Sequence, residues 1–107
     1  MSLVDDVKLL KGSQVRPSEA ETLAAALRVM AFLDRVLYKA QVWTLPRGYH
    51  YDVTAGGAEQ LCIPTRVGSE EEAARIFASD VATGWLEELC EVLGAQRSAR
   101  IRSELGL

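Results

Sequence analysis

Residues 18–43, SEAETLAAALRVMAFLDRVLYKAQVW, form the longest strongly periodic stretch of the chain. Pro17 disfavours helix before this stretch, Ser18 can cap the free amides of a first turn, and Glu21 completes a capping box. Apolar residues then recur at alternating steps of three and four, as they do on one face of an α-helix. They are Ala26, Val29, Leu33, Val36, Ala40 and Trp43. The pattern predicts a long helix over 17–44 with this face in the core.

The rest of this helix surface is unusually apolar. Its charged side chains share one narrow strip, formed by Glu21, Arg28, Arg35 and Lys39. The flanks beside the strip carry Leu27, Ala31, Phe32 and Tyr38. A helix that is apolar around most of its circumference is usually buried on several sides, either by its own domain or by a partner. Phe32 and Tyr38 are therefore candidate partner-binding residues, and so is Asp34, a charge near an apolar flank.

The composition indicates a small acidic domain. The chain has 107 residues, of which 12 are basic and 15 acidic, for a net charge of -3. This length is typical of one domain with a modest core, so we expect a single domain over 1–107. The slight acidity argues against nucleic acid or an anionic membrane as a partner. There is no long uncharged apolar run, and the first residues carry acids where a signal peptide carries bases, so we expect a cytoplasmic protein.

A second long helix is predicted over 69–94. Ser69 can cap a first turn rich in glutamate, and Gly94 can end the helix. Its apolar stripe consists of Ala74, Ala78, Val81, Trp85, Leu89 and Val92. Gly84 lies on the opposite side, where glycine costs about 1 kcal/mol of helix propensity relative to alanine. We therefore expect the helix to continue through Gly84.

Shorter helices are predicted at both ends. Residues 1–16 would form a short amphipathic helix followed by a hinge, and residues 95–107 a terminal helix docked by Ile101 and Leu105. Between the long helices, over 45–68, the helical period disappears and apolar residues alternate with polar ones from Tyr49 onward. The predicted fold is thus mainly α: two long amphipathic helices plus short terminal helices, with a β-hairpin or extended loop at about 45–68.

The middle of the chain holds a dense cluster of versatile side chains, namely Trp43, Arg47, Tyr49, His50, Tyr51, Asp52 and Cys62. Tryptophan, tyrosine and arginine are the residues that most often anchor protein interfaces. Trp43, Arg47, Tyr49 and Tyr51 are therefore predicted to bind a partner, unless the aromatic side chains simply cover the helices.

An acid–base site is the alternative interpretation of the same segment. His50 and Asp52 would share one face of a strand, with Cys62 nearby. No nucleophile lies at a sequence spacing from them that is typical of a catalytic site. The two cysteines, Cys62 and Cys90, form no CxxC motif and have no histidine cluster beside them. We therefore expect no metal and no cofactor, and we expect both cysteines to be free, buried thiols.

Together these features predict a non-enzymatic regulator that binds another protein and forms a homodimer. In size, acidity and helix content the chain resembles small anti-activators that silence bacterial transcription regulators. That resemblance implies sequestration of a regulator through its dimerisation or DNA-binding surface. Two alternatives remain: a secretion-type chaperone, which is also small, acidic and often dimeric, and a small enzyme or ligand-binding domain that uses His50, Asp52 and Cys62.

Overall fold

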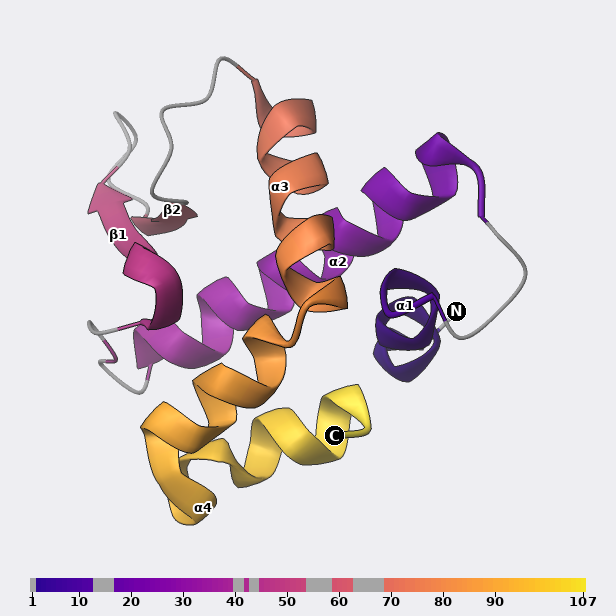
Figure 1. Ribbon diagram of the computed structural model, residues 1–107. Coiled ribbons are helices and arrows are strands. Elements are labelled where there is room, and N and C mark those ends of the chain that lie inside the picture. The colour runs from indigo at the N-terminus through magenta and orange to yellow at the C-terminus, as the bar shows by residue number, and fades with distance from the viewer. Residues whose placement is uncertain (1, 13–16, 40–41, 43–44, 54–58, 63–68) are drawn as a thin grey trace.

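The computed structural model is mainly helical and describes residues 2–12, 17–39, 42, 45–53, 59–62 and 69–107. In chain order the elements are α1 (Leu3–Leu10), α2 (Glu19–Lys39), the short 3-10 helix η1 (Pro46–Gly48), β1 (His50–Val53), β2 (Glu59–Cys62), α3 (Glu70–Ala82) and α4 (Trp85–Leu105). Helix α2 crosses the middle of the molecule and contacts α1, α3 and β2 (Figure 1). The mainly helical fold class predicted from the sequence is confirmed.

The core is built around α2. Its fully buried residues are Ala25, Ala26, Val29, Leu33 and Leu37, and α3 and α4 add Phe77, Val81, Trp85, Leu86 and Leu89. Phe32 also belongs to this core, because only 4% of it is exposed. The prediction of Phe32 as a partner-binding residue on an exposed flank is therefore wrong: several elements pack around α2, and they bury a wider face than the predicted stripe.

Two helix starts follow the predicted capping chemistry. The Ser18 hydroxyl oxygen accepts a hydrogen bond from the Glu21 amide at 3.2 Å, and the Ser18 hydroxyl donates to the Glu21 carboxylate at 3.1 Å. In the same way the Ser69 hydroxyl oxygen accepts from the Glu72 amide at 3.1 Å. Each bond satisfies an amide that has no partner inside the helix. The two long helical stretches thus begin where the sequence predicts.

The predicted continuation of helix through Gly84 is wrong. Helix α3 ends at Ala82, Gly84 takes a left-handed conformation with φ 100°, and α4 begins at Trp85. A left-handed residue cannot continue a right-handed helix, and glycine adopts this conformation without the penalty that a Cβ atom brings. Because the chain turns here, α4 presents a different face to the core from the one a straight helix would present.

Val92 shows the effect of this turn. It belongs to the predicted core stripe but is 53% exposed, whereas Leu86, Cys90 and Leu93 of α4 are buried. A second break lies at Gly94, whose φ of 83° and ψ of 166° are not helical. Gly94 therefore ends the first part of α4, as predicted.

The helical stretch after Gly94 runs to Leu105, and it is docked on the core as the sequence predicts. Ile101 is fully buried and Leu105 is 1% exposed. The end of the chain approaches α1, because a Cβ atom added to Gly106 would lie 3.0 Å from Cγ1 of Val4. No helix in the parts of the chain described here is long and apolar enough to cross a membrane.

The segment between α2 and α3 contains two short strands that pair antiparallel. His50 pairs with Cys62 at one end of the ladder, and Val53 pairs with Glu59 at the other. Residues 54–58 and 63–68 of the predicted hairpin or extended loop lie outside the described residues. A complete hairpin or extended loop over 45–68 therefore stays a prediction.

Candidate functional site

The middle segment is attached through η1 to the corner where α3 meets α4. Trp85, fully buried at the start of α4, donates its indole N–H to the carbonyl oxygen of Pro46 at 3.1 Å. Arg47 adopts a left-handed backbone conformation, with φ 59°, which is uncommon for a residue other than glycine. Such a conformation persists only when the surrounding contacts hold it. The Arg47 side chain supplies these contacts.

The Arg47 guanidinium binds several groups on the α3–α4 corner. Its Nε and Nη2 donate to the two carboxylate oxygens of Glu88 at 3.0 and 2.9 Å. Its Nη1 and Nη2 donate to the hydroxyl and carbonyl oxygens of Thr83 at 2.6 and 2.9 Å. The carboxylate of Asp80 lies 3.5 Å from Nη1. The hydrogen bonds with Glu88 raise the pKa of Arg47 and lower the pKa of Glu88. Arg47 is thus engaged within its own chain.

Tyr49 is a core residue. It is 3% exposed, and its ring packs on Trp85 with the ring centroids 4.6 Å apart. Its hydroxyl donates to the carboxylate of Asp80 on α3. Burial, and then this hydrogen bond, raises the pKa of Tyr49 above its ordinary value. For Tyr49 the structure supports the alternative in which the aromatic residues of the middle segment cover the helices.

The other residues predicted to bind a partner are placed only in part. Asp34 is half-buried on α2. Tyr38 belongs to α2 and Tyr51 to β1, but their side chains lie outside the described part of the structure, as does the whole of Trp43. Their contribution to an interface stays a prediction. The structure thus brings Arg47 and Tyr49 together, but on the protein's own helices.

The alternative acid–base site is likewise placed only in part. His50 is exposed on β1, and its Nδ1 atom lies 3.4 Å from the carbonyl oxygen of Gly48. His50 faces Cys62 across the strand pair, but the side chains of Asp52 and Cys62 lie outside the described residues. Among the residues that are described, no three His, Cys, Asp or Glu side chains cluster closely enough to hold a metal ion.

Cys90 is a free thiol in the core of α4, as predicted. It is 1% exposed, and burial raises its pKa above the ordinary value for cysteine. Thiols react as thiolates, so a buried cysteine with a raised pKa reacts slowly. Cys90 therefore packs as a small apolar residue.

Asp6 of α1 is a buried carboxylate that the sequence analysis did not single out. It is 1% exposed, and it accepts hydrogen bonds from Nε and Nη2 of Arg28 on α2, both at 2.9 Å. Its position three residues after Leu3 and four before Leu10 is the signal that places it beside the apolar stripe of α1. The pair attaches α1 to α2, because a buried carboxylate without a partner is strongly unfavourable.

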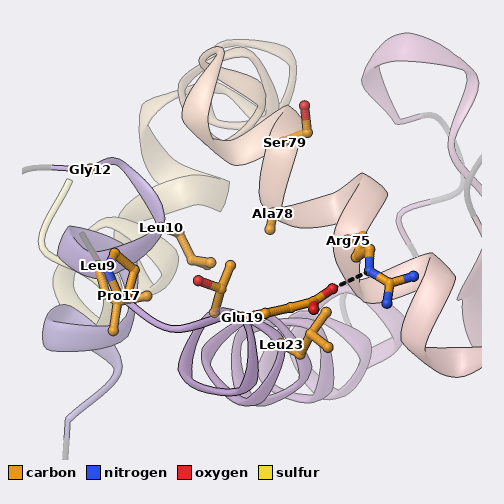
Figure 2. A pocket seen from close by; sticks show the side chains of 10 residues that line it. Leu9, Leu10, Gly12, Pro17, Glu19, Leu23, Arg75, Ala78 and Ser79 are labelled. Atoms are coloured by element: carbon orange, nitrogen blue, oxygen red, sulfur yellow. Dashed lines mark hydrogen bonds and ion pairs between the residues drawn. The ribbon is translucent and has the colours of Figure 1, made fainter.

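A groove open to solvent lies between α1, α2 and α3, with a volume of about 530 Å³. Its apolar lining comes from Leu9, Leu10, Pro17, Leu23 and Ala78. Figure 2 shows Leu10 of α1, Leu23 of α2 and Ala78 of α3 converging on this space. Grooves of this size are where proteins commonly hold ligands or side chains of a partner. The sequence prediction missed this groove, because its lining residues come from three helices.

Charged side chains border the groove on the side of α3. Arg75 donates from Nε to the Glu19 carboxylate at 2.6 Å, and from Nη2 to the Glu71 carboxylate at 2.8 Å. The first of these bonds joins α3 to the start of α2 across the groove (Figure 2). All three side chains are at least half exposed. The groove is thus lined by apolar and polar side chains in similar measure.

Comparison of the chain with protein-family models, with curated proteins and with solved structures finds no match.

Proposed function

We propose that the protein is a non-enzymatic regulator that binds another protein and holds a segment of it in the groove between α1, α2 and α3. An anti-activator would act in this way on a transcription regulator, by covering its dimerisation or DNA-binding surface. The observation that carries the proposal is the groove itself, in which the half-buried Leu9, Pro17 and Leu23 lie near the exposed charges of Glu19 and Arg75. Apolar contacts ringed by polar groups are the usual anatomy of a protein interface.

The placement of Arg47 and Tyr49 supports the choice of this surface over the middle segment. Arg47 donates to Glu88 and Thr83, and Tyr49 is buried against Trp85. A partner that used these side chains would first have to break their internal contacts, which would weaken its binding. The apolar side chains of Leu9, Pro17 and Leu23 in the groove have no hydrogen bond to break.

The experiment compares two arginine substitutions of apolar residues. Leu23→Arg places a charged side chain in the groove, whereas Val92→Arg adds the same charge on α4, where Val92 is 53% exposed and does not line the groove. Circular dichroism and urea unfolding first establish that both variants fold. The immobilised proteins are then used to capture partners from a lysate of the source cell, and light scattering gives the stoichiometry of the purified complex and of the protein alone.

We expect wild type and Val92→Arg to recover the same folded partner at a fixed stoichiometry, and Leu23→Arg to lose it. Capture of that partner by all three proteins with equal affinity would contradict the proposed function of the groove. A partner held equally well after Leu23→Arg but lost after substitution of Trp43 or Tyr51 would instead place the interface on the middle segment.

A further inference from the structure

Arg47 occupies a set of hydrogen-bond acceptors at the α3–α4 corner. Glu88 offers both of its carboxylate oxygens to the guanidinium, and Thr83 offers its carbonyl and hydroxyl oxygens. The Thr83 hydroxyl proton is donated to the carbonyl oxygen of Asp80 at 3.1 Å, so the hydroxyl oxygen is left to accept. The Asp80 carboxylate lies 3.5 Å from Nη1 of Arg47 and adds a second negative charge. We call the groups of Asp80, Thr83 and Glu88 that face Arg47 the acceptor site.

The ends of two helices supply this acceptor site. Thr83 is the C-cap residue of α3, and Glu88 lies in the first turn of α4. The negative end of the α3 dipole favours a cation, and the positive end of the α4 dipole favours the charged form of Glu88. A guanidinium fits such a site, because it is always charged and holds five N–H donors in a fixed fork. An ammonium group has three donors on one atom and cannot reproduce this arrangement.

The present occupant reaches the acceptor site at a conformational cost. Arg47 has φ 59° and ψ 27°, a left-handed conformation that lowers an equilibrium constant by about five- to thirtyfold for a residue with a Cβ atom. The Arg47 side chain is 32% exposed, and that of Glu88 is 43% exposed. Solvent therefore reaches the acceptor site beside Arg47. An arginine of another protein would approach from this side and would carry no such backbone cost.

We propose that the acceptor site binds an arginine side chain of a partner protein, and that Arg47 is an internal occupant which the incoming arginine replaces. Because the incoming guanidinium donates to the same oxygens, the hydrogen bonds to Glu88 and Thr83 are exchanged rather than lost. Arg47 then leaves its left-handed conformation, while η1 keeps its attachment through Pro46 and Tyr49. The acceptor site is separate from the groove, so this inference goes beyond the proposed function.

The first experiment empties the acceptor site. Arg47→Gly removes the guanidinium but retains the left-handed backbone, which glycine adopts without penalty. The isotope-labelled variant is titrated with N-acetyl-arginine amide, and NMR follows the backbone amide signals of Thr83 and Glu88. N-acetyl-citrulline amide is the matched neutral probe, and N-acetyl-lysine amide carries the charge without the fork. If the glycine variant fails to fold, Arg47→Asn replaces it, because asparagine also tolerates the left-handed conformation.

We expect the arginine probe to bind Arg47→Gly saturably, with a dissociation constant in the millimolar range, and to shift both amide signals. Adding Glu88→Gln should weaken this binding by about tenfold or more, because two charge-assisted hydrogen bonds are lost. Adding Glu91→Gln, which removes an exposed carboxylate elsewhere on α4, should change the affinity by less than about twofold. The inference is overturned by equal binding of the citrulline or lysine probe, by the absence of a saturable shift, or by an affinity that Glu88→Gln leaves unchanged.

The second experiment asks whether the arginine probe displaces Arg47 from wild type. A tethered side chain competes at an effective concentration of the order of millimolar, so we expect an apparent dissociation constant about tenfold higher than for Arg47→Gly. The Nε–H signal of Arg47 should move towards that of free arginine, and the lysine probe should leave it in place. A signal unmoved at about a hundred times the dissociation constant of Arg47→Gly would make Arg47 a permanent clasp and would overturn the inference. The proposed function would still stand, because Leu23→Arg tests the groove separately.

Discussion

Asp6 and Arg28 form a two-pronged ion pair between α1 and α2, with both N–H to oxygen contacts at 2.9 Å. The environment of the two charges is unequal. Asp6 is 1% exposed, whereas 44% of the Arg28 side chain is in contact with solvent. A carboxylate is kept in such a place only when a charged partner satisfies both of its oxygens. The pair therefore couples the position of α1 to that of the central helix.

Replacing Arg28 by methionine tests this coupling. The change leaves the Asp6 carboxylate buried without a partner, so we expect the free energy of unfolding to fall by about 1 to 3 kcal/mol. Solvent near the half-exposed Arg28 keeps the loss below that of a fully buried pair. Urea unfolding followed by circular dichroism measures it.

Two controls accompany the Arg28→Met variant. Arg35→Met removes an exposed arginine from the same helix and should change stability by less than about 0.5 kcal/mol. The double variant Asp6→Leu with Arg28→Met removes both charges and should recover most of the loss. Equal effects of Arg28→Met and Arg35→Met would show that the ion pair does not hold α1.

The left-handed conformation of Gly84 determines whether alanine at this residue raises or lowers stability. Alanine at a residue with φ 100° is strained, so Gly84→Ala should destabilise the protein by about 1 to 2 kcal/mol. The added Cβ atom itself has room, since its nearest neighbour is Oε2 of Glu87 at 3.9 Å. A helix continuous through residue 84 would instead gain about 1 kcal/mol from the same change.

Thermal and urea unfolding of Gly84→Ala distinguish the two cases. The matched control is Ala31→Gly at an exposed position inside α2, which should cost about 1 kcal/mol and calibrates the glycine-to-alanine difference in a helix of this protein. Stabilisation by Gly84→Ala would mean that α3 and α4 are one helix.

Gly84 also shows which parts of the fold the sequence can predict. Ser18 and Ser69 act through local hydrogen bonds, so their capping motifs predict two helix starts without knowledge of the tertiary structure. A glycine in an apolar helical pattern is ambiguous, because its cost of about 1 kcal/mol in a helix is easily outweighed by packing. Here a bend at Gly84 buries both Trp85 and Leu86, and tertiary contacts decide the outcome.

The candidate site was harder to predict for a related reason. Arg47 and Tyr49 have the composition of an interface, which is why the sequence predicts that they bind a partner. It does not distinguish a partner's surface from the protein's own α3–α4 corner, which supplies Asp80, Thr83 and Glu88. The groove has no local signature, since Leu10, Leu23 and Ala78 are far apart in sequence and only the packing of three helices brings them together.

We expect ionisation of Tyr49 to lower the stability of the protein at alkaline pH. Its pKa is raised in the folded protein, mainly by burial, above an ordinary value of 10.0. The folded state therefore holds the phenolic proton more tightly than the unfolded state does. This contribution is complete below pH 10.0 and is lost as the pH rises above that value, because ionisation then favours the unfolded chain.

The tyrosinate absorbance of Tyr49, obtained as the difference between wild type and Tyr49→Phe, should develop only as helical circular dichroism is lost. At neutral pH, Tyr49→Phe should cost about 1 kcal/mol, because the hydrogen bond to Asp80 is removed. Ionisation of Tyr49 near pH 10.0 in a protein that retains its helices would show that the phenol is accessible to water.

We expect protonation of Glu88 at acidic pH to change the structure locally, at the α3–α4 corner. Its pKa lies below the ordinary value of 4.5, chiefly because Arg47 donates two hydrogen bonds to its carboxylate. The contribution of this pair to stability is therefore present above pH 4.5 and is lost as the pH falls through the lower pKa of the folded state. Protonated Glu88 no longer holds Arg47 by charge, and the left-handed backbone of Arg47 then loses part of its support.

Because Pro46 and Tyr49 contact Trp85, near-UV circular dichroism reports on this corner. In a Trp43→Phe background, which leaves Trp85 as the only tryptophan, the signal should change below pH 4.5 before the helices unfold. Glu88→Gln should show the altered signal already at neutral pH and lose that acidic transition, whereas Glu91→Gln should titrate like wild type. If Glu88→Gln gave the wild-type signal at neutral pH, Thr83 and Asp80 would suffice to hold Arg47. The charge of Glu88 would then not be needed to position the middle segment.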